Sequence, residues 1–297
     1  LNFGGYWNWD PVENASLVPW LTGVGSLHAM LAYQKGKTNL HLTFTLVAAT
    51  FLLVLYSTFL TRSGILGEAS VHSFTDLGLS GQLLLLLLAY VGFVLLVFVH
   101  HWRRLPHDRP TETIWTRDFF LFLAAAALAL SALEISMFTS LPVINKILGT
   151  KYAPPANVPL FYFKWNVWFG ILIATLSAIG QFFFWTKIEK KELTAAIFRP
   201  LFWAVLATIG IMATMLAVDW GHEPRWKFGF QELWFKGIEA AQESGNWGRI
   251  IMTYLGNGLL MLADELLLLA GLFALFANGY IIFRLVRRSK RNWRHVG

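Results

Sequence analysis

Residues 3–28, FGGYWNWDPVENASLVPWLTGVGSLH, decide the fold because they join an aromatic loop to the first long apolar helix. Asp10 can cap a helix that begins at Pro11, and Glu13 can reach back to the cap, which is the capping-box pattern. The free N–H groups and the dipole of such a helix end favour an anion. The two glycines before the aromatic residues let the loop backbone approach a flat group closely. This stretch therefore predicts a binding loop for a flat, apolar ligand that carries negative charge.

The composition is that of a membrane protein. Of the 297 residues, 56% are hydrophobic and only 14% are charged, whereas a water-soluble domain carries about 25% charged residues. We therefore predict an all-α, polytopic membrane helix bundle. The chain holds no cysteine, which excludes disulfides, thiol catalysis and zinc–thiolate sites. Because the sequence begins within a motif and lacks an initiating methionine, we expect a fragment of a longer chain.

Seven apolar runs are long enough to cross a bilayer, and we treat residues 1–297 as a single membrane domain. The predicted helices cover residues 17–33, 39–60, 81–100, 119–142, 165–186, 200–219 and 259–283. Three further segments are distinguished within the domain: the aromatic motif with the first helix (1–33), an external histidine loop (61–80) and an external interfacial segment (220–258).

The basic residues predict the orientation in the membrane. With the N-terminal loop outside, the inner segments hold sixteen of the 24 lysines and arginines, which agrees with the positive-inside rule. The net charge of +7 is thereby explained by cytoplasmic loops in contact with membrane lipid, and no nucleic acid partner is predicted.

Two passages resemble a known family. The run GGYWNWDPVEN resembles the tryptophan-rich (WWD) signature of the haem-handling membrane proteins of cytochrome c maturation, with Tyr6 where that family usually has tryptophan. The passage from Leu60 to Phe74, LTRSGILGEASVHSF, resembles a segment of the haem lyase branch of that superfamily, the CcmF type. With both passages in order along the chain, the sequence is identified as similar to this branch.

The resemblance implies an external haem site. Tyr6, Trp7, Trp9 and Asp10 match the family's haem-binding loop, and His72 matches an axial ligand of the haem in transit to its acceptor. Haem, with its propionates, is also a flat, apolar and anionic molecule. From the residues themselves, Asp10 and Glu13 are expected to be structural and to cap the helix.

A second haem site is implied within the membrane. His28 matches a ligand of a permanently bound haem b, and it lies in the predicted first helix, in the cytoplasmic half of the bilayer. We expect roughly 15–20 Å between His28 and His72 along the membrane normal, from the helical rise, so one haem cannot use both. The second axial ligands are expected outside this chain, and the fragment alone is expected to be inactive.

The reaction implied by the resemblance joins haem vinyl groups to the CxxCH cysteines of apocytochrome c, outside the cytoplasmic (inner) membrane of a bacterium. The implied partners are apocytochrome c, a haem chaperone, and thiol-reducing or apocytochrome-binding maturation subunits. Two alternatives stay open from the residues: a haem exporter or donor without ligation activity, and a quinone- or ion-linked subunit. Glu134, inside an apolar run, is the one carboxyl well placed for the latter; it is expected to be protonated or to face the bundle interior.

Overall fold

The structure is a computed structural model that describes residues 7–67, 69–70, 72, 78–106, 116–155, 157–183, 190–218, 242–243 and 247–293. Within these ranges all regular structure is helical, which confirms the predicted all-α class. The chain forms two compact units that divide within one helix, after Phe169. The single membrane domain stays a prediction.

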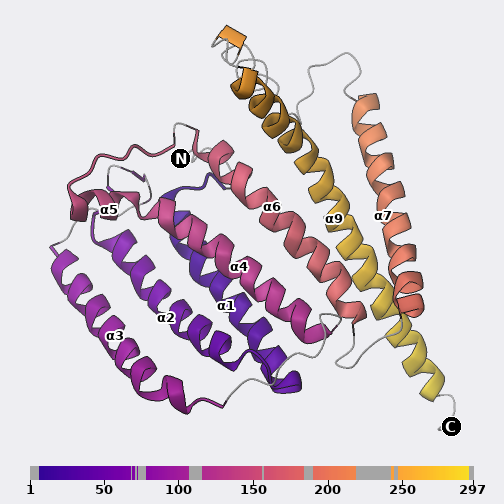
Figure 1. The fold of residues 1–297 in the computed structure, drawn as a ribbon, viewed down its shortest axis with the longest axis horizontal. Coiled ribbons are helices and arrows are strands. Elements are labelled where there is room, and N and C mark those ends of the chain that lie inside the picture. Colours follow the sequence, from indigo (N-terminus) through magenta and orange to yellow (C-terminus); the bar gives the residue numbers. More distant parts are fainter. Residues whose placement is uncertain are drawn as a thin grey trace. The chain divides into compact units, whose positions relative to one another are not determined.

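The helices follow one another along the chain as drawn in Figure 1. They are α1 (Pro11–Gly36), α2 (Leu40–Arg62), α3 (Ser80–His101), α4 (Arg117–Thr139), α5 (Leu141–Leu148), α6 (Val158–Ile179), α7 (Lys190–Val218) and α9 (Trp247–Trp293), with short 3-10 turns η1 (Trp102–Arg104) and η2 (Gly180–Phe182). Seven helical segments in the described part of the chain are long and apolar enough to cross a membrane, as predicted.

Four helices begin well before the predicted membrane spans. The spans expected from 17, 165, 200 and 259 lie in helices that begin at Pro11, Val158, Lys190 and Trp247. The prediction followed the apolar residues, whereas a helix continues into polar residues for as long as its backbone hydrogen bonds are made. As a result Asp264 and Glu265, which could be read as the outer edge of the last helix, lie well inside its apolar span Ile251–Arg287.

The first unit is organised around α1, which packs along both α2 and α4 (Figure 1). Ala29 and Ala32 are fully buried on this face of α1. A Cβ added to Gly25 would lie 3.4 Å from the Ala125 carbonyl oxygen of α4, so the two backbones approach closely there. Small residues are what allow transmembrane helices to pack at such short range.

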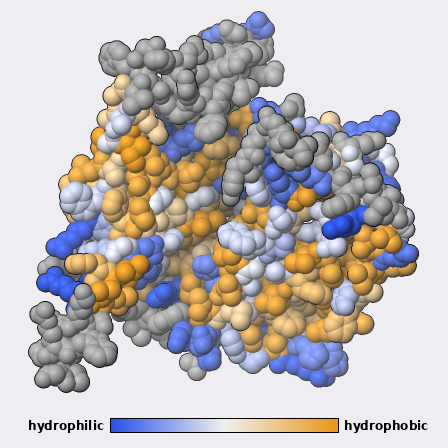
Figure 2. Space-filling model, turned by 180° about the vertical axis from the view of Figure 1, so that it is seen from behind, coloured by the Kyte–Doolittle hydropathy of each residue, from blue (hydrophilic) through white to orange (hydrophobic). Residues whose placement is uncertain are grey.

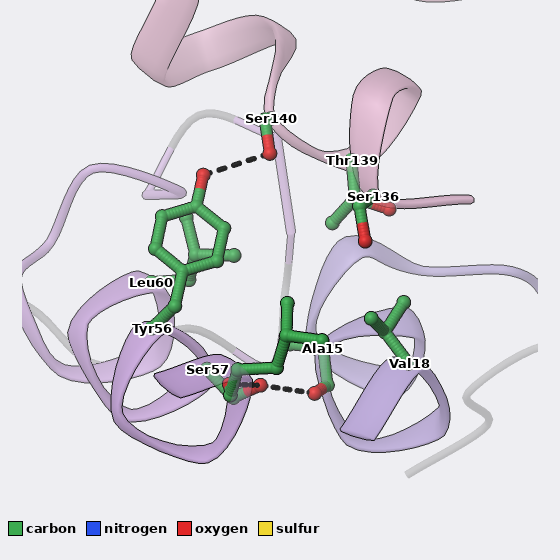
Figure 3. A pocket seen from close by; sticks show the side chains of 9 residues that line it. Ala15, Val18, Tyr56, Ser57, Leu60, Ser136, Thr139 and Ser140 are labelled. Atoms are coloured by element: carbon green, nitrogen blue, oxygen red, sulfur yellow. Dashed lines mark hydrogen bonds between the residues drawn. The ribbon is translucent and has the colours of Figure 1, made fainter. Parts of the chain in front are cut away.

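Hydroxyl groups join the same helices. The Thr50 hydroxyl of α2 donates to the Thr22 hydroxyl of α1 over 3.0 Å, and the Ser57 hydroxyl donates to the Ala15 carbonyl. Tyr56 donates to the Ser140 hydroxyl at the end of α4 over 2.7 Å. The bonds made by Ser57 and Tyr56 border a small cavity between the three helices, shown in Figure 3. Because a bilayer offers no water to such groups, they bond to one another and fix the register of the helices.

The helix α3, which buries no side chain against its neighbours, is covered with exposed apolar side chains. No residue of α3 is buried, and Val99 is 81% exposed. Apolar side chains, orange in Figure 2, also cover much of the molecular face seen there. A surface of this kind is suited to contact with lipid chains, in keeping with a multi-pass membrane protein.

Replacing Gly36 by alanine tests the packing at the C-terminal end of α1. An added Cβ would overlap the carboxylate of Asp118, which is only 8% exposed. Overpacking of this kind costs about 1–3 kcal/mol, so we expect a lower thermal unfolding midpoint in detergent. Gly23→Ala is the control, because its new Cβ would meet only Thr50 at an ordinary 3.6 Å. Equal midpoints for the two variants would show that this contact is absent.

Candidate functional site

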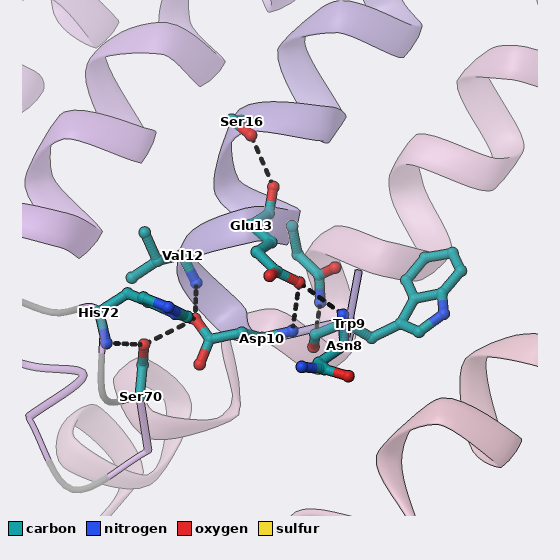
Figure 4. Close-up of polar contacts among 9 residues, drawn as sticks. Asn8, Trp9, Asp10, Val12, Glu13, Ser16, Ser70 and His72 are labelled. Carbon is teal, nitrogen blue, oxygen red and sulfur yellow. Dashed lines mark hydrogen bonds and ion pairs between the residues drawn. The ribbon is translucent and has the colours of Figure 1, made fainter. Parts of the chain in front are cut away.

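The predicted capping box is present at the start of α1 (Figure 4). The Val12 backbone N–H donates to Asp10 Oδ1 over 2.8 Å. The backbone N–H groups of Asp10 and Asn8 both donate to Glu13 Oε2, over 3.2 and 2.9 Å. The anion that this helix end favours is thus supplied by the chain's own carboxylates. Because these N–H groups already donate to Asp10 and Glu13, they are not available to a haem propionate. The predicted binding of the ligand's negative charge by these donors is therefore not supported.

Trp9 adopts an unusual backbone conformation in front of the cap. Its φ of 57° is left-handed, which is strained for a bulky residue by about 1–3 kcal/mol. Two contacts offset that strain: the fully buried Asn14 donates from Nδ2 to the Trp9 carbonyl over 3.1 Å, and the indole stacks on Tyr162 at 4.8 Å between ring centroids. Strain of this kind is typical of ligand-binding sites.

The aromatic rings of the loop differ in accessibility. Trp7 meets Trp9 edge to face, with ring centroids 6.1 Å apart, and is 36% exposed. One face of Trp9 is covered by Tyr162, at an interplanar angle of 12°. Trp7 is therefore the more open ring for a flat ligand. The predicted third ring, Tyr6, lies outside the described residues.

The segment after α2 is anchored by one apolar side chain. Leu66 is fully buried in a cluster with Ala15 and Leu60. Gly64 turns the chain with a left-handed φ of 73°, a conformation that glycine adopts without strain. The Ser70 backbone N–H then donates to the Leu66 carbonyl over 2.9 Å. Leu66 thus fixes the direction in which the chain leaves the bundle.

This anchored segment brings His72 to the start of α1, as Figure 4 shows. The Ser70 hydroxyl donates to Asp10 Oδ1 over 2.6 Å, and the His72 backbone N–H donates to the Ser70 hydroxyl over 3.0 Å. His72 Nδ1 lies 3.5 Å from Asp10 Oδ1. The histidine and the aromatic loop, predicted from separate passages of the sequence, are therefore neighbours in the fold.

A carboxylate next to Nδ1 suits a histidine for binding a metal through Nε2. It favours the tautomer with hydrogen on Nδ1, orients the ring and makes Nε2 a better ligand. The His72 side chain is 27% exposed and Asp10 13%, so a ligand can reach the imidazole while the carboxylate stays largely shielded. His72, with its ring oriented by Asp10, is thus suited to bind the iron of a haem placed against Trp7.

His28 forms no part of this cluster. It lies on α1, which is helical without interruption from Pro11 onward, about 27 Å of helical rise from Asp10. Its Nδ1 lies 2.8 Å from the Val24 carbonyl, so Nδ1 is the donor and Nε2 the acceptor. It stands beside the 58% exposed Leu27. A second, separate haem ligand is compatible with this setting.

The sequence did not reveal three residues of the site. Ser70, Asn14 and Tyr162 support Asp10 and Trp9 from other turns and helices. The only available signals were that Ser70 lies within the histidine passage and Tyr162 within an aromatic cluster. Glu134 faces the bundle interior, as one of the two expectations had it, and accepts a hydrogen bond from Asn166 Nδ2 over 2.9 Å.

The cavity of Figure 3 is not a haem site. Its volume is about 10 Å³, room for about one water molecule and far below the roughly 300–1,000 Å³ of pockets that enclose larger organic ligands.

Comparisons with known proteins agree on one process. Residues 1–66 match the family model described as cytochrome C assembly protein. The chain is 46% identical over 195 residues to cytochrome c-type biogenesis protein CycK of Bradyrhizobium diazoefficiens, covering 65% of this chain and 29% of that protein. It is 28% identical over 226 residues to cytochrome c-type biogenesis protein CcmF of Escherichia coli, covering 76% and 33%.

A further relative is cytochrome c-type biogenesis protein ccl1 of Rhodobacter capsulatus, 29% identical over 280 residues, which cover 88% of this chain and 42% of that protein. The chain thus spans about a third of the length of most relatives that it matches. No solved structure matches it.

Removing the Asp10 side chain tests whether it ties the two segments together. In Asp10→Ala, α1 loses its cap and Ser70 loses its acceptor. Loss of a cap costs about 1 kcal/mol, and we expect roughly fivefold faster hydrogen exchange at the backbone amides of Val12, Ser70 and His72. Ser16→Ala is the control, because that hydroxyl bonds only within α1 among the contacts described. Unchanged hydrogen exchange in Asp10→Ala would show that Asp10 does not join the two segments.

Proposed function

We propose a function from one premise: this chain belongs to the CcmF-type family of cytochrome c-type biogenesis proteins. A role in cytochrome c maturation follows from the premise. We propose that the whole protein attaches haem covalently to the CxxCH cysteines of apocytochrome c, and that this chain contributes the haem-holding part. The observation that carries the proposal is the approach of His72 Nδ1 to Asp10, next to the aromatic loop.

Each residue has a distinct task in this proposal. Trp7 offers a ring face for the porphyrin, and Trp9, packed on Tyr162, holds Trp7 in place. His72 binds the iron through Nε2 while Asp10 orients the imidazole. Haem supplies the reactive vinyl groups: the S–H of a cysteine adds across the C=C bond, sulfur to one carbon and hydrogen to the other. The protein contributes position, by holding the vinyl edge where the thiols arrive.

His28 is proposed to serve a second haem, of the b type, inside the membrane. The Val24 carbonyl fixes its Nδ1 as donor and leaves Nε2 for iron. Its distance along α1 from the loop, about 27 Å, is too long for one haem to use both histidines. A haem b held there would supply electron-transfer chemistry, and the task of His28 would be to bind its iron through Nε2.

The orientation proposed is that of a bacterial inner-membrane protein with the aromatic loop on the periplasmic side. It follows from the sixteen of 24 basic residues on the opposite side. The proposed partners are apocytochrome c, a haem chaperone that delivers the haem, and subunits that reduce or present the cysteine thiols. The parts of the relatives that this chain does not span are the proposed source of the second axial ligands.

Histidine replacements in the full-length protein test the two sites. We expect His28→Ala to remove the low-spin b-type absorbance and His72→Ala to abolish capture of added haem at the outer site, because each loses an iron ligand. Absorbance spectra of the purified, reconstituted variants give the result. His100→Ala is the control, because His100 is an exposed histidine near the C-terminal end of α3 and belongs to neither proposed site. The proposed function is wrong if His72→Ala captures haem as the wild type does.

Thioether formation separates a lyase from an exporter. We expect the wild-type protein, given haem and reduced apocytochrome c, to yield a haem that acid–acetone extraction leaves on the cytochrome. A protein that captures haem at His72 but never produces this covalent product would instead be a haem donor.

Asp10→Asn tests the charge of the carboxylate apart from its capping role. Asparagine still caps α1 and still accepts from Ser70, but the negative charge beside His72 Nδ1 is lost. Removal of such a partner weakens metal ligation by about 10–100-fold, so we expect haem capture to weaken in this range with an unchanged thermal midpoint. Glu13→Gln, which alters the other cap carboxylate, should leave capture within twofold. Equal capture by Asp10→Asn and the wild type would exclude this role.

A further inference from the structure

Tyr162 supports the aromatic loop by stacking against Trp9. It lies near the start of α6, 153 residues after Trp9 in the sequence, and is only 3% exposed. Its ring is nearly parallel to that of Trp9, with an interplanar angle of 12°. An aromatic pair of this geometry gains about 0.5–1.5 kcal/mol beyond the area it buries. The stack therefore determines the plane of the Trp9 indole.

The hydroxyl end of Tyr162 is also fixed. It lies 3.3 Å from the Thr139 hydroxyl of α4. The buried Asn14 donates to the Trp9 carbonyl. Trp9 is therefore held at its backbone by Asn14 and at its indole by the stack on Tyr162.

A polar group inside the bundle supports Tyr162 from behind. Asn166, one turn further along α6, donates from Nδ2 to the Tyr162 carbonyl over 3.2 Å and to Glu134 Oε2 over 2.9 Å. The Ser131 hydroxyl of α4 donates to Asn166 Oδ1 over 2.8 Å. Groups within a bilayer must satisfy one another. Asn166 is therefore held by α4 on both its oxygen and its nitrogen, and this fixes the rotation of α6.

We propose that Tyr162 is a positioning residue for haem captured at the outer site, and that Asn166 and Glu134 hold Tyr162 in place. This inference rests on the proposed function, because it deepens the description of the same site. Trp9 is in a strained left-handed conformation, so its indole keeps its orientation only while the surrounding contacts impose it. Trp7 packs edge-on against Trp9, and a tilt of Trp9 moves the ring offered to the porphyrin.

In this proposal Glu134 acts as a hydrogen-bond acceptor, and its charge plays no part. Asn166 Nδ2 needs an oxygen at this position, and the amide oxygen of glutamine supplies one equally well. Glu134→Gln therefore separates positioning from proton or ion transport. A transporting carboxyl loses its function on this change, whereas an acceptor keeps it.

The experiment is a haem titration of the full-length protein, reconstituted in lipid and followed by Soret absorbance relative to His72→Ala. We expect Tyr162→Leu to weaken capture about 2- to 12-fold, from the free energy of the aromatic stack. Tyr162→Phe keeps the ring and should stay within twofold. Asn166→Ala, which leaves the ring in place but removes its support, should weaken capture at least twofold, and Glu134→Gln should stay within twofold. The g values of the ferric outer haem should shift in Tyr162→Leu and be restored in Tyr162→Phe.

Tyr90→Leu is the matched control, because it also removes an aromatic contact between helices, with Phe51, but does so on α3. Thermal midpoints identify variants that fail to fold; if Tyr162→Leu is one, Asn166→Ala decides. The inference is overturned if Tyr162→Leu and Asn166→Ala titrate like the wild type, or if Glu134→Gln loses capture as Asn166→Ala does. If His72→Ala itself titrates like the wild type, the failure belongs to the proposed function.

Discussion

The carboxylate of Asp10 is the interaction on which the site depends. Its Oδ1 accepts from the Val12 backbone at the start of α1 and from the Ser70 hydroxyl, and it lies 3.5 Å from His72 Nδ1. One oxygen atom therefore joins the aromatic loop, the first transmembrane helix and the segment that follows the second. A loop outside a helix bundle has few apolar contacts to hold it, and a shared, partly buried acceptor gives it a defined position.

The contacts of Asp10 hold the site in a defined geometry because the segments that they join are rigid. Close packing of α1 against α4 at Gly25, and the hydroxyl bonds between α1 and α2, prevent the helix that carries Asp10 from rotating. Leu66 fixes the segment that carries Ser70 and His72. A binding site needs its groups held within about 0.5 Å, and here the membrane helices give that precision to residues that lie beyond their ends.

Local sequence predicted one half of this arrangement. The order Asp-Pro-Val-Glu specifies the capping box, and the apolar runs specify the number of membrane helices. The bond from Ser70 to Asp10 spans 60 residues, and the stack of Trp9 on Tyr162 joins the loop before α1 to α6. Such contacts depend on how helices pack, which hydrophobic periodicity does not report. The starts of α7 and α9 were missed for a local reason. The apolar runs mark only part of each helix, and polar helical turns extend beyond them.

We propose that His72, oriented by Asp10, holds the iron of a haem that lies against the aromatic loop. The most direct measurement is a cryo-electron microscopy map of the full-length protein in lipid, with haem added and trapped before transfer. We expect the iron at bonding distance from His72 Nε2, Asp10 within hydrogen-bonding distance of Nδ1, and the porphyrin face on Trp7. An iron ligated elsewhere, with the His72 imidazole turned away from Asp10, would contradict the claim.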